Sequence, residues 1–146
     1  MVKGEQGMNG EYEHTLDSKG RMNFPAKLRE EFGDSFFIAK SYNEECLTVY
    51  TKEKWEELNK KLDDKPSKVA LPFKRFVIGS AREVAPDNQG RILIAPGLRT
   101  YAKISSEVVV VGLGDRAEIW DKASWEEYNN NTSLDEIAEL ADELGI

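Results

Sequence analysis

The sequence predicts a β-rich α+β protein built from two copies of one structural unit. Three observations support this: a repeat at a spacing of 70 residues, short β-forming runs separated by turn residues, and helix N-caps at matching places in both copies. The 146 residues suit one domain or two small ones, and they can bury a core without disulfides. The single cysteine, Cys46, excludes an intrachain disulfide and fits a reducing compartment.

The repeat is clearest in two short phrases, DSKGR at 17–21 and DNQGR at 87–91. With the sequence shifted by 70 positions, segments 13–29 and 47–57 match their counterparts at ten of 28 positions. Ordinary composition would give roughly two such matches. The Asp, Gly and Arg of both phrases are among them, and the register is kept from one segment to the next. We therefore interpret the chain as an internal duplication.

Each copy has the same predicted order of elements. The predicted strands are residues 11–16, 21–24, 35–39 and 47–50 in the first copy and 81–85, 91–94, 107–111 and 118–120 in the second. A helical turn should follow Pro25 and Pro96, and Gly33 should end the first one. A helix should close each copy, with Thr51 and Asp121 as N-caps.

Two more helices are predicted outside the strands. Residues 67–78 form an amphipathic pattern that Pro72 interrupts. Ser133 and Glu136 form a capping box, followed by an apolar stripe of Leu134, Ile137, Ala138, Leu140, Ala141 and Leu144. Such a helix, acidic on its other face, is typical of a solvated lid on a core or of a subunit contact. The predicted division of the chain is 11–53 for the first repeat, 54–81 for linker helices, 82–125 for the second repeat and 126–146 for a C-terminal acidic helix.

The charge is unevenly distributed along the chain. The net charge of −7 argues against nucleic acid, because phosphate contacts need positive charge. Residues 115–146, however, contain ten acidic and two basic residues, so the remaining residues have a net charge of +1 and can present positive patches. The polar segment 1–13 lacks the apolar run of a signal peptide. The aliphatic run 108–111 is too short to span a membrane, so we expect no membrane association.

The doubled phrase has a physical interpretation. An Asp that opens a tight turn accepts hydrogen bonds from the amides after it, and Gly adopts positive φ without steric cost. The turn does not require Arg at the next position. In a single copy, a surface Arg paired to the Asp would explain the pattern. In two copies, the planar fork of Arg21 and Arg91 favours binding to phosphate or to a guanine edge.

Catalytic chemistry is not indicated. Gly112-x-Gly114-x-x-Ala117 matches the dinucleotide fingerprint in form, but a strand follows it where the fingerprint needs a helix, so we predict a hairpin. His14 is the only histidine and has no catalytic partner in the pattern. No cluster of Cys and His has metal-ligand spacing. Trp55 and Trp125 recur at one repeat position, which favours core packing. We expect neither an enzyme nor a bound cofactor, metal or small-molecule substrate.

With both D-x-x-G-R phrases in place, the chain resembles the MraZ family of bacterial transcriptional regulators. GEYEHTLDSKGRMNFPAKLRE is similar to the opening of that family, and VVVVGLGDRAEIWDKASWEEY to its second half. The resemblance covers roughly residues 9–145, and MVKGEQG at the start lies outside it. The doubled D-x-x-x-R phrase is specific when it occurs twice at this spacing.

The resemblance implies a fold of two AbrB/SpoVT-type units paired as a swapped-hairpin β-barrel, a pseudo-dimer, with flanking helices. It implies subunits that assemble into a ring-like homo-oligomer in the cytoplasm, associated with the nucleoid. This oligomer would bind short tandem repeats of double-stranded DNA in the promoter of its own operon, within the division and cell-wall gene cluster.

The family motif also implies roles for particular residues of this sequence. Arg21 and Arg91 correspond to the arginines tied to DNA contact, and Asp17 and Asp87 to the turn residues beside them, with Gly20 and Gly90 completing the two turns. Lys19 is a further candidate phosphate contact. Its counterpart in the second copy is the uncharged Gln89, so we expect the first copy to contribute more to binding than the second.

Two other classes of function remain open. AbrB-type barrels also serve as antitoxins or protein-binding modules, but the capped C-terminal helix differs from the disordered arm of an antitoxin. A barrel enzyme or a substrate-recruiting barrel is the third class, and the lack of a nucleophile with a paired base weighs against it.

Overall fold

The computed structural model describes residues 7–146. The predictions about a signal peptide and a leading extension fall largely on residues 1–6, which lie outside the described residues. The strands are β1 (Met8–Thr15), β2 (Arg21–Asn23), β3 (Phe36–Lys40), β4 (Leu47–Tyr50), β5 (Arg82–Val84), β6 (Arg91–Leu93), β7 (Glu107–Gly114) and β8 (Ala117–Asp121). The helices are α1 (Ala26–Phe32), α2 (Lys52–Asp63), α3 (Ser67–Phe76), α4 (Pro96–Tyr101), α5 (Lys122–Asn130) and α6 (Leu134–Glu143), with a short 3-10 turn at Ile78–Ser80.

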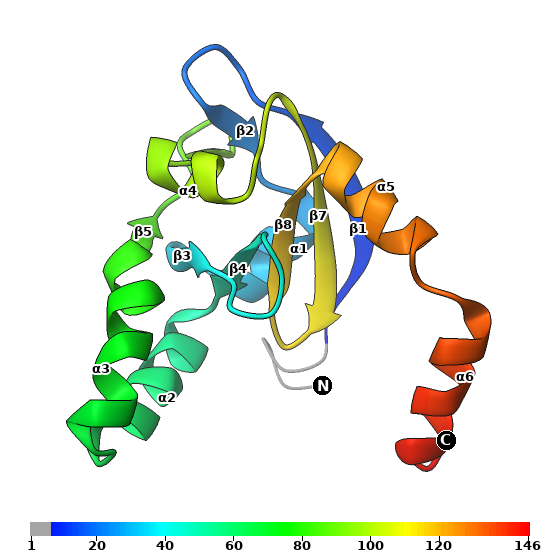
Figure 1. The fold of residues 1–146 in the computed structure, drawn as a ribbon. Coiled ribbons are helices and arrows are strands. Elements are labelled where there is room, and N and C mark those ends of the chain that lie inside the picture. Colours follow the sequence, from blue (N-terminus) through cyan, green and yellow to red (C-terminus); the bar gives the residue numbers. More distant parts are fainter. Residues whose placement is uncertain (1–6) are drawn as a thin grey trace.

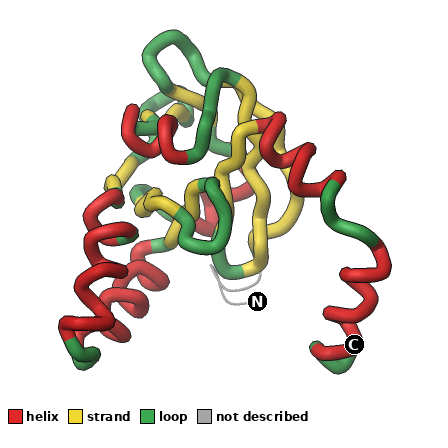
Figure 2. Tube along the Cα trace, viewed as in Figure 1, coloured by secondary structure: helices red, strands yellow, loops and turns green. Residues whose placement is uncertain are grey.

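The strands form two antiparallel sheets, shown in yellow in Figure 2. The larger has the order β1-β7-β8-β4-β3-β5, and the smaller is a two-stranded ribbon of β2 and β6. The prediction of a β-rich α+β fold is confirmed. The closed barrel is not confirmed, because β1 and β5 are the free edges of the larger sheet and no ladder joins them within residues 7–146.

The two repeats are interlocked through these sheets. Strand β1 of the first repeat pairs with β7 of the second, and β5 of the second pairs with β3 of the first. The remaining ladders between the repeats, β4–β8 and β2–β6, each join a strand to its own repeat counterpart. Each repeat therefore completes the sheet of the other, and an approximate two-fold axis passes through the β2–β6 ribbon.

The predicted caps are present. Gly33 ends α1 with φ of 78°. The side chain of Thr51 accepts a hydrogen bond from Lys54 N at the start of α2, and that of Asp121 accepts one from Ser124 N at the start of α5. Ser133 caps α6 in the same way, through the amide of Glu136. The local sequence thus determines where these helices begin, as expected for side chains that satisfy free amides of the first turn.

The glycines of 112–114 have structural roles and form a hairpin, as predicted. A Cβ on Gly112 would lie 2.7 Å from the backbone nitrogen of Asn9, so glycine allows β1 to approach β7 closely. Gly114, with φ of 96°, makes the turn into β8. The close approach lets the ladder continue from Thr15 to Met8, so both strands extend three residues further than predicted.

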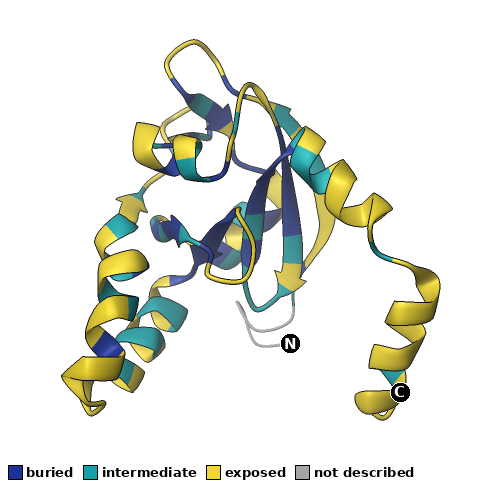
Figure 3. Cartoon of the chain, in the orientation of Figure 1, coloured by how far each residue is buried: buried dark blue, intermediate teal, exposed yellow. Residues whose placement is uncertain are grey.

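The core lies between the sheets and the short helices α1 and α4 (Figure 3). Phe24, Phe32 and Phe36 pack at its centre, with ring centroids 4.7–5.4 Å apart. The two repeat tryptophans pack as predicted: Trp55 stacks on Phe37, and Trp125 lies edge-on to Trp120. These aromatic contacts attach α2 and α5 to the larger sheet.

The helices at the two ends of the molecule differ. Helix α3 runs through Pro72 and packs inward, whereas α6 projects from the body and leaves its apolar residues exposed (Figures 1 and 3). The interpretation of the C-terminal helix as a lid on the core of its own chain is therefore wrong. The N-caps predicted at Asp121 and Ser133 begin two separate helices, α5 and α6.

Candidate nucleic-acid interface

The two Asp-x-x-Gly-Arg turns have nearly the same hydrogen bonds. In the first, Asp17 Oδ1 accepts from the backbone amides of Lys19 and Arg21, each at 2.9 Å. The amide of Gly20 donates to the carbonyl oxygen of Asp17 at 3.0 Å. The second turn repeats these contacts, with the amides of Gln89 and Arg91 on Asp87 Oδ1 at 2.9 Å. The aspartates thus organise both turns, as their side-chain chemistry predicts.

The same aspartates orient the arginines. Arg21 Nε donates to Asp17 Oδ2 at 2.8 Å, and Arg91 Nε donates to Asp87 Oδ2 at 2.9 Å. Within residues 7–146, neither guanidinium has a further ion pair or hydrogen bond through its terminal nitrogens. Their side chains are 32% and 28% exposed. Each turn therefore holds an arginine by its Nε and leaves the four terminal N–H donors free for a ligand.

The electrostatics keep these pairs charged. Backbone hydrogen bonding from Arg21 is the largest cause that lowers the pKa of Asp17 below its usual value, and the Arg21 side chain adds to the effect. The amide of Arg91 likewise lowers the pKa of Asp87. Both carboxylates are thus ionised at neutral pH, so each aspartate keeps its ion pair with the arginine of its turn.

The arginines share one face of the β2–β6 ribbon. Met22 and Ile92 form the central pair of the ribbon and are buried, so the residues on either side of them point outward. We call this outward surface the ribbon face; it consists of Arg21, Asn23, Arg91 and Leu93. Leu93 is 53% exposed although it is apolar. Sequence reasoning missed Asn23 and Leu93, which the two-residue period of the strands could have found.

Each turn is braced by the other repeat. The amide of Ile94 donates to the carbonyl oxygen of Gly20 at 2.9 Å, and Phe24 makes the matching bond to Gly90. Both glycines have positive φ, 81° and 78°. The guanidinium of Arg99 packs against Gly20 at a site where an added Cβ would be 3.0 Å away.

Arg29 is the repeat counterpart of Arg99, and it packs in the same way against Gly90. Its Nε is buried and has no hydrogen-bond partner within the part of the chain that the structure describes. Arg99 instead donates from Nε to the carbonyl oxygen of Ile94 at 3.0 Å. Sequence reasoning did not assign these two arginines, although their identity in the repeat alignment was a signal. They add two guanidinium groups beside the turns.

Lys19 and Gln89 occupy equivalent, exposed positions at the tips of the turns. The side chain of Lys19 has no ion pair among residues 7–146. The first turn therefore presents one positive charge more than the second, and the structure places this extra charge at the exposed tip.

No other cluster suggests catalysis in the described chain. Among residues 7–146, no group of three Cys, His, Asp or Glu side chains could hold a metal ion. Cys46 is fully buried, and burial raises the pKa of its thiol to about 12, so it is a poor nucleophile. Of the helices in this same range, none is long and apolar enough to cross a membrane.

Comparison with known proteins identifies the family. The family model described as "MraZ protein, putative antitoxin-like" matches residues 8–71 and again 77–144. The chain is 48% identical over 141 residues to the transcriptional regulator MraZ of Thermoanaerobacter sp. (strain X514), covering 94% of this chain and 98% of that protein. The chain belongs to the MraZ family.

Other MraZ proteins show similar agreement over the same length. Identity is 45% with the transcriptional regulator MraZ of Alkaliphilus metalliredigens and 44% with that of Clostridium tetani. Each comparison covers 94% of this chain and 98% of the relative. Because MraZ is a family of transcriptional regulators and not of enzymes, the prediction that this chain is not an enzyme is confirmed.

Proposed function

We propose that this protein is a sequence-specific DNA-binding transcriptional regulator that contacts double-stranded DNA through the ribbon face and its two turns. The observation that carries the proposal is the doubled arginine, held by its own aspartate with its terminal nitrogens free. The relatives are named transcriptional regulators, which supports this class of function. The target that we propose is a set of short tandem repeats in the promoter of its own operon, within the division and cell-wall gene cluster.

The geometry suits contact with a duplex. Arg21 and Arg91 lie on one outward surface, one residue to either side of the central Met22–Ile92 pair. A two-stranded β-ribbon fits the major groove, where the paired terminal nitrogens of arginine match the O6 and N7 atoms of guanine. Asn23 on the same face is suited to adenine, and the exposed Leu93 to a thymine methyl group.

We propose the remaining features of the assembly with this function. The interlocked repeats correspond to two AbrB/SpoVT-type units, residues 11–53 and 82–125, arranged as a swapped-hairpin pseudo-dimer. Copies of the chain form a ring-like homo-oligomer in the cytoplasm, associated with the nucleoid. A single copy presents few positive groups, so several copies acting together would raise affinity through effective concentration.

A titration of duplex DNA from the promoter of its own operon tests the proposal, with wild type compared to Arg21→Ala. The substitution removes one bidentate contact, worth about 1–3 kcal/mol or roughly fivefold to 150-fold in affinity for each engaged subunit. Arg116→Ala is the matched control, because Arg116 is also paired to an aspartate, Asp115, at 38% side-chain exposure. Arg116 lies in the β7–β8 hairpin, and its substitution should leave affinity unchanged. A folded Arg21→Ala protein with wild-type affinity would remove the turn from the interface.

A second function is favoured by one observation. Helix α6 exposes an apolar stripe, and the family description includes the words "antitoxin-like", so binding to another protein is the alternative. Co-purification of a stoichiometric small protein, with no shift of promoter DNA, would favour this alternative.

A further inference from the structure

Helix α6 has no cover within its own chain. Its apolar stripe, which we define as Leu134, Ile137, Leu140 and Leu144, is between 49% and 87% exposed. None of these residues belongs to a hydrophobic cluster of the described chain. A helix of 10 residues is shorter than the roughly 12–15 that are marginally stable alone in water. The helix therefore needs a surface to pack on.

The corresponding helix of the first repeat has such a surface. Helix α3 follows α2 as α6 follows α5. Its Ala70 is buried, and its Phe73, with Val77 just after the helix, packs in a cluster with residues of the larger sheet. Val77 is fully buried, and Phe73 packs in a cluster with Trp55 of α2. The two ends of the pseudo-symmetric molecule are thus unequal, since one has its second helix covered and the other has it free.

The outer side of α3 offers a matching surface. Val69, Pro72 and Phe76 follow at spacings of three and four residues, so they share one side of the helix. Val69 is 69% exposed and Phe76 40%. Lys68 and Arg75 lie beside them. We call this surface the outer face of α3.

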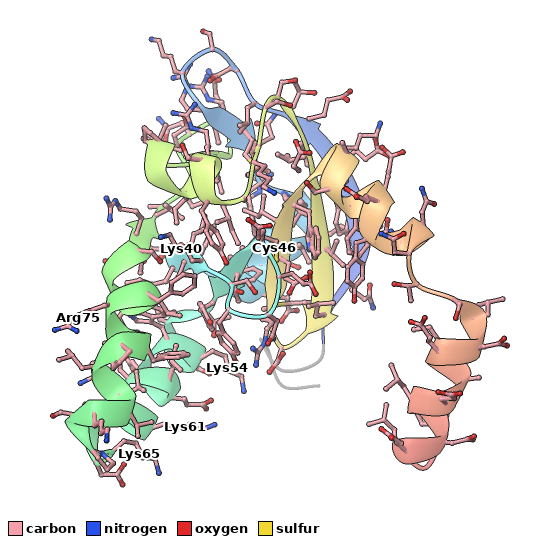
Figure 4. The ribbon with its side chains drawn as sticks, in the orientation of Figure 1. Lys40, Cys46, Lys54, Lys61, Lys65 and Arg75 are labelled. Carbon is pink, nitrogen blue, oxygen red and sulfur yellow. The ribbon has the colours of Figure 1, made fainter. Side chains whose placement is uncertain are left out.

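The charges of the two helices are opposite. All charged residues of α3 are basic, namely Lys68, Lys74 and Arg75, and all charged residues of α6 are acidic, namely Asp135, Glu136, Glu139, Asp142 and Glu143. Figure 4 shows Arg75 pointing away from the body on the outer side of α3. The apolar stripe of α6 thus has acidic edges, and the outer face of α3 has basic ones.

We infer that α6 of one subunit docks its apolar stripe on the outer face of α3 of the next subunit. The inference rests on the homo-oligomer proposed above and names the contact that builds it. Figure 1 places α6 and the α2–α3 pair on opposite sides of the body, so each copy offers a donor on one side and an acceptor on the other. Such a contact is heterologous and repeats head to tail, which closes into a ring when the rotation permits.

The charges favour this contact over a pairing of α6 with α6, and the contact is also compatible with binding at the turns. Two acidic helices would bring ten negative charges together without a positive charge between them. The Asp17–Gly20 turn also lies at the other end of the molecule from α6, so docking at α3 leaves it accessible (Figure 1).

Charge reversal on each surface tests the inference. One variant carries Glu136→Lys and Glu143→Lys, which lie seven residues apart along one edge of the stripe. The other carries Lys68→Glu and Arg75→Glu, at the same spacing on α3. Sedimentation should show that each variant alone dissociates at concentrations about tenfold or more above those at which wild type does. The control for the α6 variant carries Glu30→Lys in α1 and Asp34→Lys just after it, both at exposed sites. It has the same charge change and should assemble as wild type does.

Mixing the variants decides the partner surface. An equimolar mixture of the two reversed variants should restore the assembly, because every contact again joins opposite charges. The α6 variant keeps an intact α3 surface, so α6 of wild type should dock on it, but its own reversed α6 cannot continue the contact. A mixture with wild type should therefore form smaller assemblies than wild type alone. An α3 variant that assembles alone as wild type does would show that α6 pairs without α3 and would overturn the inference, as would a mixture of the two variants that remains monomeric. A wild-type monomer at concentrations that bind DNA would also overturn it.

The outcome is separable from that of the proposed function. The dissociated variants retain Arg21 and the ribbon face, so they should still bind a duplex with weaker affinity, and Arg21→Ala should reduce that binding further. If assembly responds to charge reversal as expected but Arg21→Ala does not change DNA binding, only the proposed function is contradicted. Normal DNA binding with charge-insensitive assembly would contradict the docking of α6 alone.

Discussion

The two repeats agree closely at their turns and differ at their ends. Both turns make the same contacts around Asp17 and Asp87, within about 0.2 Å, whereas α3 is packed and α6 is exposed. A turn depends on five consecutive residues, so duplication preserves it wherever they are kept. The cover of a helix depends on distant residues, and these can diverge between copies. The turns are thus the structural unit that the two copies share, and the ends are where the copies differ.

The largest effect in this comparison is expected from the turn glycines. Gly20→Ala and Gly90→Ala would force a non-glycine residue to positive φ, at about 1–2 kcal/mol in the free energy of unfolding. Gly33→Ala is the control for backbone strain alone, because its φ is also positive and no atom lies within 4 Å of its added Cβ. At position 90 the new Cβ would also displace the Arg29 guanidinium.

Urea unfolding measures these costs. Gly90→Ala should cost more than Gly33→Ala, and the excess should vanish when Arg29→Ala opens the space. An equal cost at positions 33 and 90 would mean that Arg29 moves aside freely and does not brace the second turn.

An intermediate effect is expected at the turn tips, where the repeats differ by one charge. The plot of log affinity against log salt has a negative slope, and Lys19→Gln should make it less steep by about 0.9, the value for one phosphate contact. Gln89→Lys should make the slope steeper by a similar amount, because it gives the second tip the same charge as the first. A salt titration of promoter DNA binding provides the measurement. Unchanged slopes in both variants would show that the tips do not reach the phosphates.

The smallest effect is expected from acidification. The folded pKa of Asp17 lies below its ordinary value of 3.8, so its ionised contacts contribute stability above that pH. This contribution is lost as the pH falls through the folded pKa. Asp17→Asn should therefore be less stable than wild type at pH 7, and the difference should shrink below pH 3.8. Asp34→Asn, at an exposed site after α1, serves as the control in unfolding measurements across this range. If the stability difference between Asp17→Asn and wild type does not change with pH, the ionised carboxylate of Asp17 does not stabilise the turn.

Local features were predictable from the sequence, and long-range ones were not. The turns, the caps at Thr51 and Asp121 and the Gly112–Gly114 hairpin depend on neighbouring residues, so their chemistry could be recognised directly. The bracing of each turn by the opposite repeat could not be predicted, because Arg29 and Arg99 contact residues that lie about 60–80 positions away in the chain. The exposure of α6 was equally hidden, since an apolar stripe shows that a helix needs a cover but not which surface provides it.

The interlocked sheet also affects how the protein is made. Strand β1 is synthesised well before its partner β7, which begins at Glu107. At about 5–20 residues per second, β1 waits roughly 5–20 s for that partner to emerge from a ribosome. Only the β3–β4 hairpin can pair early, because its strands lie within residues 36–50. Folding of the larger sheet is therefore completed late, and β1 stays unpaired while the rest of the chain up to β7 is synthesised.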